Sequence, residues 1–137
     1  MIAIIDYGVG NLFSLASSLK SLGLETKVTR DAAAIRAADH IILPGVGAFA
    51  DAMAKLEATG LVPVIKQEVE HKPLLGICLG MQLLFEKSYE YGEHTGLGLI
   101  PGEVCPLADD LKDPGLKVPH IGWNRLDIVP GRENDPL

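Results

Sequence analysis

Apolar residues along the first half of the chain switch between two spacings. Residues 1–5 are uniformly apolar, which is typical of a parallel strand buried on both faces. Residues 12–22 repeat leucine and alanine at helical spacing, and Gly23 follows where the helix would end. Further strands are predicted at residues 24–29, 40–43 and around Leu74, and further helices after Asp31, at about 48–56 and from Pro63 toward Glu70. This alternation predicts an α/β fold, with an open, mostly parallel, doubly wound sheet and helices on both faces.

One apolar run leads into a different kind of turn. It reaches Cys78, which lies between Gly76 and Gly80, and helical spacing through Phe85 then predicts a helix. The spacing small-x-nucleophile-x-small is typical of a nucleophile elbow, whose sharp turn exposes the central side chain at the carboxyl end of a strand. A position at a helix N-terminus favours the thiolate form. The alternative is a structural cysteine, in which case each glycine costs about 0.5–1 kcal/mol of stability without benefit.

A second glycine-rich turn is expected at the same rim of the sheet. Residues 44–47, Pro-Gly-Val-Gly, follow the strand predicted at 40–43, and ligands of open α/β sheets collect at the carboxyl ends of the strands. Backbone N–H groups of this turn and of Leu79 are predicted to face the oxyanion that forms when Cys78 attacks a carbonyl. Without Cys78, the turn would be interpreted as an ordinary connection between a strand and a helix.

The sequence identifies no partner base for the thiol, although a cysteine nucleophile normally has a histidine within reach. His40 and His71 precede their strands and fall on the opposite edge of the sheet, whereas His94 and His120 follow in loops. A dinucleotide site at residues 8–10 is excluded because Phe13 occupies the third glycine position. No spacing of cysteine and histidine suits a closed metal site, and no cofactor is predicted.

The residues after Ser88 have a weaker pattern. A loop is predicted at residues 89–98, a strand within 99–107, a solvated turn at 108–115 and a strand at 125–129. Residues 130–137 are polar and contain no closing element. The chain of 137 residues is therefore predicted to be a single domain across residues 1–137.

Composition narrows the possible partners. The net charge of −6, without any basic run, argues against nucleic acid. The sequence shows neither a cleavable leader nor an apolar run of about 18 residues, which predicts a soluble cytoplasmic protein with no membrane partner. In that compartment Cys78 and Cys105 are expected to remain unpaired, with Cys105 structural.

The elbow resembles that of the class I, triad-type glutamine amidotransferases, which reads Gly-x-Cys-x-Gly-x-Gln and corresponds here to residues 76–82. Within that family, residues 6–11, 44–49 and 117–124 are most similar to the glutaminase subunits of imidazole glycerol phosphate synthases, and the similarity runs from Met1 to about Val129. The resemblance implies a flavodoxin-like core and hydrolysis of glutamine through a thioester on Cys78. It also implies that ammonia passes to a (β/α)₈-barrel cyclase subunit, as a step of histidine biosynthesis.

The resemblance further implies roles for individual residues. The oxyanion N–H groups would come from Val46, Gly47 and Leu79. Glutamine would be held by Gly47 and Gln82, and its α-amino group would contact Glu90. The residues near the cyclase would be Asn11, His120 and Trp123. Taken alone, Gln82 and Glu90 would be interpreted as solvent-facing residues. The family takes its His and Glu from a later segment, to which nothing here corresponds, so the domain is expected to be truncated and inactive alone. Alternatives are a non-catalytic binding fragment and an amidotransferase domain that serves another synthase.

Overall fold

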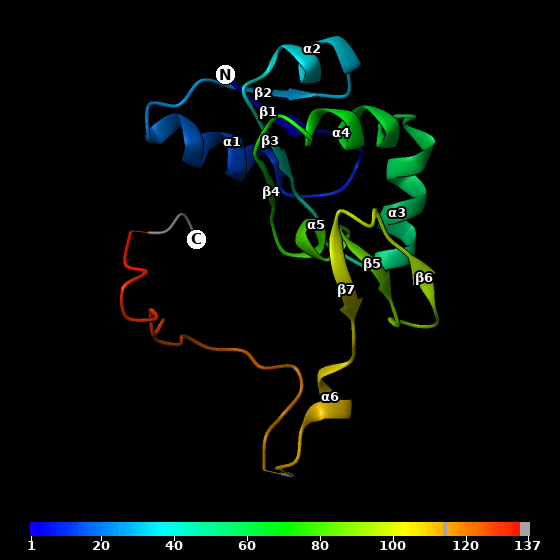
Figure 1. Cartoon of the computed structure of the whole chain (residues 1–137), viewed down its shortest axis with the longest axis vertical. Coiled ribbons are helices and arrows are strands. Elements are labelled where there is room, and N and C mark those ends of the chain that lie inside the picture. Colours follow the sequence, from blue (N-terminus) through cyan, green and yellow to red (C-terminus); the bar gives the residue numbers. More distant parts are fainter. Residues whose placement is uncertain (114, 135–137) are drawn as a thin grey trace. The chain divides into compact units, whose positions relative to one another are not determined.

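The structure, a computed structural model, describes residues 1–113 and 115–134 (Figure 1). It divides into two compact units, Met1–Pro106 and Leu107–Leu137. No helix in the described ranges is long and apolar enough to cross a membrane. The single domain expected across residues 1–137 stays a prediction.

A parallel sheet of four strands forms the centre of the first unit. Its strands lie in the order β2 (Thr26–Thr29), β1 (Ile2–Ile5), β3 (His40–Leu43) and β4 (Leu74–Gly76). The strands are short and consist mostly of apolar or β-branched residues, as the sequence predicted. Because all four are parallel, their carboxyl ends share one edge of the sheet.

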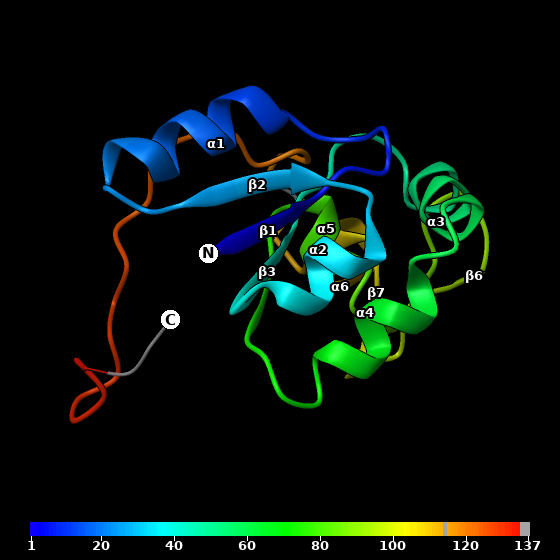
Figure 2. The same cartoon turned by 90° about the horizontal axis from the view of Figure 1, so that it is seen from above.

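Helices cover both faces of this sheet. Helix α1 (Leu12–Ser21) connects β1 to its neighbour β2, whereas α2 (Ala32–Ala37) returns past β1 to β3. Right-handed crossovers that run in opposite directions along a sheet place their helices on opposite faces. Helices α3 (Phe49–Ala58) and α4 (Val62–Glu68) connect β3 to β4 and lie on the side of α2, away from α1 (Figure 2). The predicted doubly wound α/β fold is confirmed.

The two faces of the sheet are covered to different extents. On the face toward α2, α3 and α4, the strand residues Ile5 and Leu43 are completely buried, as is Phe49 at the start of α3. Full burial of such side chains contributes about 1.5–3 kcal/mol each, so this face supplies most of the core. On the opposite face, Val28 and Leu75 lie in register with buried β1 and β3 residues yet are each 40% exposed. Helix α1 contains no fully buried residue.

The segment after the elbow differs from its prediction. Helix α5 spans only Leu79–Gln82, and Phe85 begins a strand, β5 (Phe85–Ser88). The predicted helix through Phe85 is wrong because the Leu83 and Leu84 carbonyl oxygens accept N–H groups from residues 97, 99 and 100 instead of from a further helical turn. Gly96 permits this approach, since a Cβ there would collide with the Phe85 carbonyl oxygen. Strand β5 pairs with β6 (His94–Thr95) and β7 (Ile100–Val104) in a small second sheet, of which only β7 was predicted.

The second unit contains one short helix, α6 (Leu107–Asp110), at the start of the predicted turn. The strand predicted at residues 125–129 is wrong: these residues have no ladder partner among the described residues, and a strand requires one. Pro114 of the predicted turn and residues 135–137 of the predicted polar end lie outside the described residues.

Candidate active site

Cys78 lies at a strained bend between β4 and α5. Its backbone has φ 56° and ψ −120°, and Tyr91 is the one other residue besides glycine with a positive φ in the part of the chain that the structure describes. Such a backbone conformation costs of order 1–3 kcal/mol and persists where the surrounding structure enforces it. The thiol is unpaired and exposed. The strand, sharp turn and helix of the predicted elbow are thus present, although α5 has only a single turn to contribute a dipole.

Close packing explains the two glycines of the elbow. A Cβ at Gly76 would lie 2.5 Å from the Met81 Cα atom, so the turn closes onto the helix that follows it. A Cβ at Gly80 would collide with the Leu43 carbonyl oxygen at the end of β3. Both positions therefore require glycine because backbone occupies the space where a side chain would be.

The Pro44–Gly47 turn lies directly against the elbow. A Cβ at Gly45 would approach the Gly80 nitrogen to 2.5 Å and the Leu79 carbonyl carbon to 3.0 Å. Beyond this contact, Val46 and Gly47 are exposed, and Gly47 has φ +93°. The backbone N–H groups of Val46, Gly47 and Leu79 donate no hydrogen bond to another described residue. Two free donors of the turn therefore lie beside the elbow, and the elbow itself supplies a third at Leu79.

Two buried or half-buried side chains contact the ends of this turn. The Tyr7 hydroxyl donates to the Pro44 carbonyl oxygen at 2.7 Å, and a Glu90 carboxylate oxygen accepts the Phe49 N–H at 2.6 Å. Burial raises the pKa of Tyr7 to about 12, so the hydroxyl is protonated and able to donate at neutral pH. Sequence reasoning missed both contacts, since they join residues 37 and 41 positions apart.

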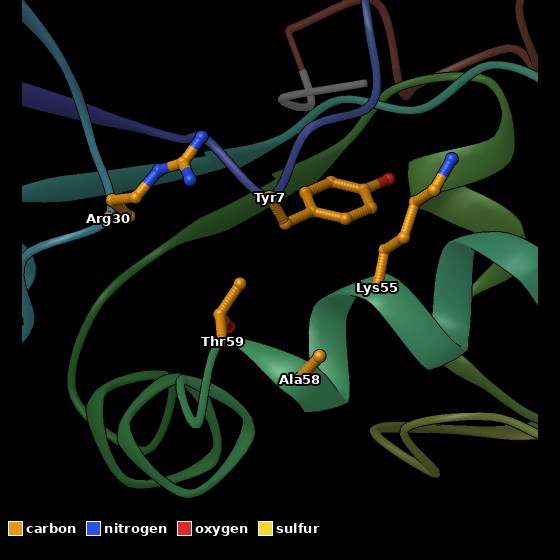
Figure 3. A pocket seen from close by; sticks show the side chains of 5 residues that line it. All are labelled: Tyr7, Arg30, Lys55, Ala58 and Thr59. Atoms are coloured by element: carbon orange, nitrogen blue, oxygen red, sulfur yellow. The ribbon is translucent and has the colours of Figure 1, made fainter.

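A pocket of about 310 Å³ lies near the carboxyl ends of β1 and β2, and Cys78 is not among its lining residues. It is lined by Tyr7, Arg30, Lys55, Ala58 and Thr59 (Figure 3). Its two cationic side chains are already paired, Arg30 with Asp6 at 2.7 Å and Lys55 with Asp51 at 2.8 Å. The Arg30 hydrogen bond lowers the pKa of Asp6. No group of three potential ligand side chains in the described ranges is placed to hold a metal ion.

Sequence comparison identifies the family to which these features belong. The family described as glutamine amidotransferase class-I matches residues 3–126. The chain belongs to the class I glutamine amidotransferase family. Residues 44–47 and 76–80, which the structure packs together, both lie within the matched range.

Several curated relatives in this amidotransferase family are similar to most of the chain. Proteins named imidazole glycerol phosphate synthase subunit HisH are 51% identical over 131 residues in Syntrophotalea carbinolica, 54% over 125 in Aquifex aeolicus and 56% over 126 in Moorella thermoacetica. These alignments cover 90–93% of this chain but only 58–64% of the relatives. The chain thus spans about three fifths of the length of the relatives it matches.

A solved structure supports the amidotransferase fold. A chain described as a crystal structure of glutamine amidotransferase superposes with a TM-score of 0.65 at 23% identity, covering 77% of this chain and 56% of that one. At that identity the likeness establishes the fold alone.

The remaining predicted amidotransferase residues have distinct environments. Gln82 ends α5 and is half-buried, and Glu90 is half-buried with its carboxylate at the N-terminus of α3. Asn11 has a local structural role that the prediction overlooked: its Oδ1 accepts the Ser14 N–H at 3.2 Å and caps α1. The sequence signal was available, because asparagine before a helical repeat is a favoured cap.

The histidines of the first unit, His40, His71 and His94, form no hydrogen bond with the Cys78 thiol. His40 begins β3 and His71 precedes β4, as predicted, at the edge opposite the carboxyl ends of the strands, and His94 lies in β6. His120 belongs to the second unit, where its Nε2 lies 2.8 Å from Asn124 Nδ2. Trp123, in the same unit, is completely exposed. Within the first unit, no described residue forms a hydrogen bond with Cys78 Sγ.

Proposed function

We propose that this chain forms the nucleophile-bearing part of a glutaminase. The Cys78 thiolate attacks the side-chain amide carbon of glutamine, forming a C–S bond and placing negative charge on the amide oxygen. Collapse of this intermediate expels ammonia, after the nitrogen accepts a proton, and leaves a thioester. Water then attacks the thioester, and the C–S bond breaks to release glutamate and the thiol.

One observation carries this proposal: the strained Cys78 elbow packs backbone to backbone against a turn with free N–H groups. The N–H groups of Val46, Gly47 and Leu79 are the donors proposed for the oxyanion of both tetrahedral intermediates. Removal of one such donor typically costs about 10²–10³ in rate.

The substrate contacts follow the family pattern, again as a proposal. Gly47 and Gln82 hold the glutamine, and Glu90 binds its α-amino group. Only one Glu90 oxygen accepts the Phe49 N–H, which leaves the other available for an ammonium group. The half-buried position of Gln82 one turn after Cys78 supports its role beside the nucleophile.

The proposed partner is a (β/α)₈-barrel cyclase that receives the ammonia in a cytoplasmic heterodimer. This proposal is supported by the relatives' name, which identifies each as a subunit of imidazole glycerol phosphate synthase. The proposed heterodimer acts as a lyase in histidine biosynthesis. Asn11, His120 and Trp123 are the residues proposed for the interface. Exposed aromatic side chains are enriched among residues that dominate interface energies, and Trp123 is such a residue.

Residues 1–137 alone are proposed to have essentially no turnover. The supporting observation is that no histidine in the first unit forms a hydrogen bond with Cys78. Proton transfer to the leaving nitrogen and from the attacking water each typically gain about 10²–10⁴-fold from a positioned acid or base. The same observation favours the second candidate function, a non-catalytic binding fragment that keeps the fold. Glutamate release should be compared, with the cyclase present, between this chain and a chain extended to the relatives' full length. Comparable rates would contradict the proposal and favour a base within these residues, with His120 the first candidate.

Labelling of the cysteines tests the nucleophile directly. A chloroketone analogue of glutamine should modify Cys78 much faster than Cys105, although both thiols are exposed. Added glutamine should protect Cys78, and Cys78→Ser should abolish the fast phase. Peptide mapping identifies the modified residue. Predominant labelling of Cys105 would rule out the elbow assignment.

A further inference from the structure

Two side chains from distant parts of the sequence hold opposite ends of the turn between β3 and α3. At the first end, the Tyr7 hydroxyl donates to the Pro44 carbonyl oxygen at 2.7 Å. At the other end, the Glu90 carboxylate accepts the Phe49 N–H at 2.6 Å. Residues 45–48 lie between these two bonds and include Val46 and Gly47, the proposed oxyanion donors.

The first end is fixed by the loop that follows β1. Tyr7 is only 3% exposed, so its ring cannot move far from Pro44. Gly10 of the same loop also contacts this proline, because a Cβ there would lie 3.1 Å from the Pro44 Cβ atom. The loop therefore holds Pro44 both by a buried hydrogen bond and by direct packing.

The second end is fixed by the segment after β5. Ala48, the N-cap residue of α3, has no side chain able to cap the helix, so Glu90 supplies the acceptor from 41 residues away. A carboxylate at a helix N-terminus is favourable, and a charge-assisted bond to an N–H group is stronger than a neutral one. Completely buried Ser88 accepts the Glu90 N–H at 3.1 Å and fixes the backbone that carries this carboxylate.

The middle of the turn has one further restraint, at Gly45. Its backbone packs against the Leu79–Gly80 peptide, whereas Val46 and Gly47 are exposed beyond that contact. The orientation of the two exposed peptide groups therefore depends on the positions of the two ends.

We propose that Tyr7 and Glu90 are positioning residues, which act through Pro44 and Phe49 to aim the Val46 and Gly47 N–H groups at the elbow. The inference rests on the proposed function for one point, that these N–H groups bind the oxyanion. For Glu90 this positioning role is additional to its proposed contact with the α-amino group of glutamine.

Two probes separate oxyanion binding from simple thiol reactivity. The first is a chloroketone analogue of glutamine that lacks the α-amino group: the thiolate adds to its carbonyl, charge moves to the oxygen, and transfer of sulfur to the adjacent carbon expels chloride. The second is iodoacetamide, in which the thiolate displaces iodide without an oxyanion. Rates of Cys78 modification are measured by peptide mapping for wild type, Tyr7→Phe, Glu90→Ala and Glu90→Gln. Tyr91→Phe and Glu93→Gln serve as matched controls, because both residues are exposed and make no hydrogen bond to the turn.

Tyr7→Phe and Glu90→Ala should slow the chloroketone by about 10- to 100-fold, since small displacements of oxyanion donors are costly. Iodoacetamide rates should stay within about twofold, because attack on it requires no oxyanion donor. Glu90→Gln keeps an oxygen acceptor for the Phe49 N–H but loses the charge, so it should slow this probe less than Glu90→Ala does. The analogue that carries the α-amino group should react more slowly with Glu90→Gln, which isolates the loss of the negative charge. Both control variants should match wild type.

Three results would overturn the inference. Unchanged chloroketone rates in Tyr7→Phe and Glu90→Ala would show that the end contacts do not position the donors. Equal slowing with both probes would show a general disturbance of the elbow. If wild-type Cys78 reacts no faster than Cys105 with the chloroketone, the proposed function itself fails and the positioning role with it. That result is recognised without any variant.

Discussion

The elbow region is closely packed, whereas large apolar side chains of residues 107–134 are exposed. Around Cys78, the loop after β1, the turn after β3 and residues 76–80 contact one another through glycines and buried hydrogen bonds. In residues 107–134, Ile121, Trp123 and Leu126 are 87–103% exposed. Catalytic groups must be held to a fraction of an ångström, which requires packing within the chain. The partner surface that we propose for residues 107–134 instead presents apolar side chains that a partner would bury.

The largest difference between the two regions should appear when an aromatic side chain is removed from each. Phe49→Ala deletes a completely buried ring and should lower the free energy of unfolding by about 3–5 kcal/mol. Trp123→Ala deletes a fully exposed ring and should change it by less than about 0.5 kcal/mol. Urea unfolding measures both changes.

In a chain extended to the relatives' length, Trp123→Ala should weaken cyclase association by about 2 kcal/mol or more, with an almost unchanged Tm. A large drop in Tm with unchanged association would contradict the interface role.

A glycine substitution in each region tests backbone contact. Gly80→Ala drives a methyl group into the Leu43 carbonyl and should cost about 3 kcal/mol, because backbone on both sides must shift. It should also reduce the fast reaction of Cys78 with the glutamine chloroketone. Gly122→Ala is the matched control, since nothing lies within 4 Å of the added atom. Equal stabilities of the two variants would show that the elbow is looser than the structure indicates.

Asn11 distinguishes a folding role from a partner role at a single residue. Asn11→Ala removes the cap of α1 and should cost about 1 kcal/mol of stability in thermal or urea unfolding. Asn11→Ser keeps a capping oxygen and should restore most of this loss. If Asn11 also contacts the cyclase, both variants should weaken association. Restored association in Asn11→Ser would assign the residue to capping alone.

The smallest effect concerns the ion pair between Asp6 and Arg30. The hydrogen bond from Arg30 holds the pKa of Asp6 below the usual carboxyl value. The ion pair therefore stabilises the fold fully at pH values above the unfolded-state pKa of about 4. This stabilisation is lost as the pH falls through the lower pKa of the folded state. Because Arg30 is 65% exposed, solvent limits the contribution to about 0–1 kcal/mol. Arg30→Gln should therefore reduce stability slightly at neutral pH and flatten its dependence below about pH 4. Stability curves that remain parallel to acid pH would contradict this assignment.

Local sequence patterns determined the first unit well. Repeats of apolar residues predicted all four strands of the parallel sheet and helices α1 to α4, since burial of one helix face or of a whole strand fixes the spacing of apolar side chains. The glycines around Cys78 predicted a sharp turn, because few other residues permit one. The prediction of a strand at residues 125–129 was wrong because a local pattern cannot supply a partner strand. These residues match the pattern of a strand, but a strand also requires a neighbouring strand with which to form hydrogen bonds.

Tertiary structure alone decided which distant residues meet at the candidate site. The spacing around Phe85 indicated a longer helix, yet residues 96–100 compete for the same carbonyl groups and convert it to strand β5. Tyr7 and Glu90 gave no local signal of their contacts with Pro44 and Phe49, because those contacts depend on how separate elements pack. The sequence by itself thus determined the fold class and predicted the sharp turn that carries the candidate nucleophile, since both follow from local backbone and burial preferences. The packing of segments far apart in the chain decided what holds the turn beside that nucleophile, because such contacts depend on all the elements together.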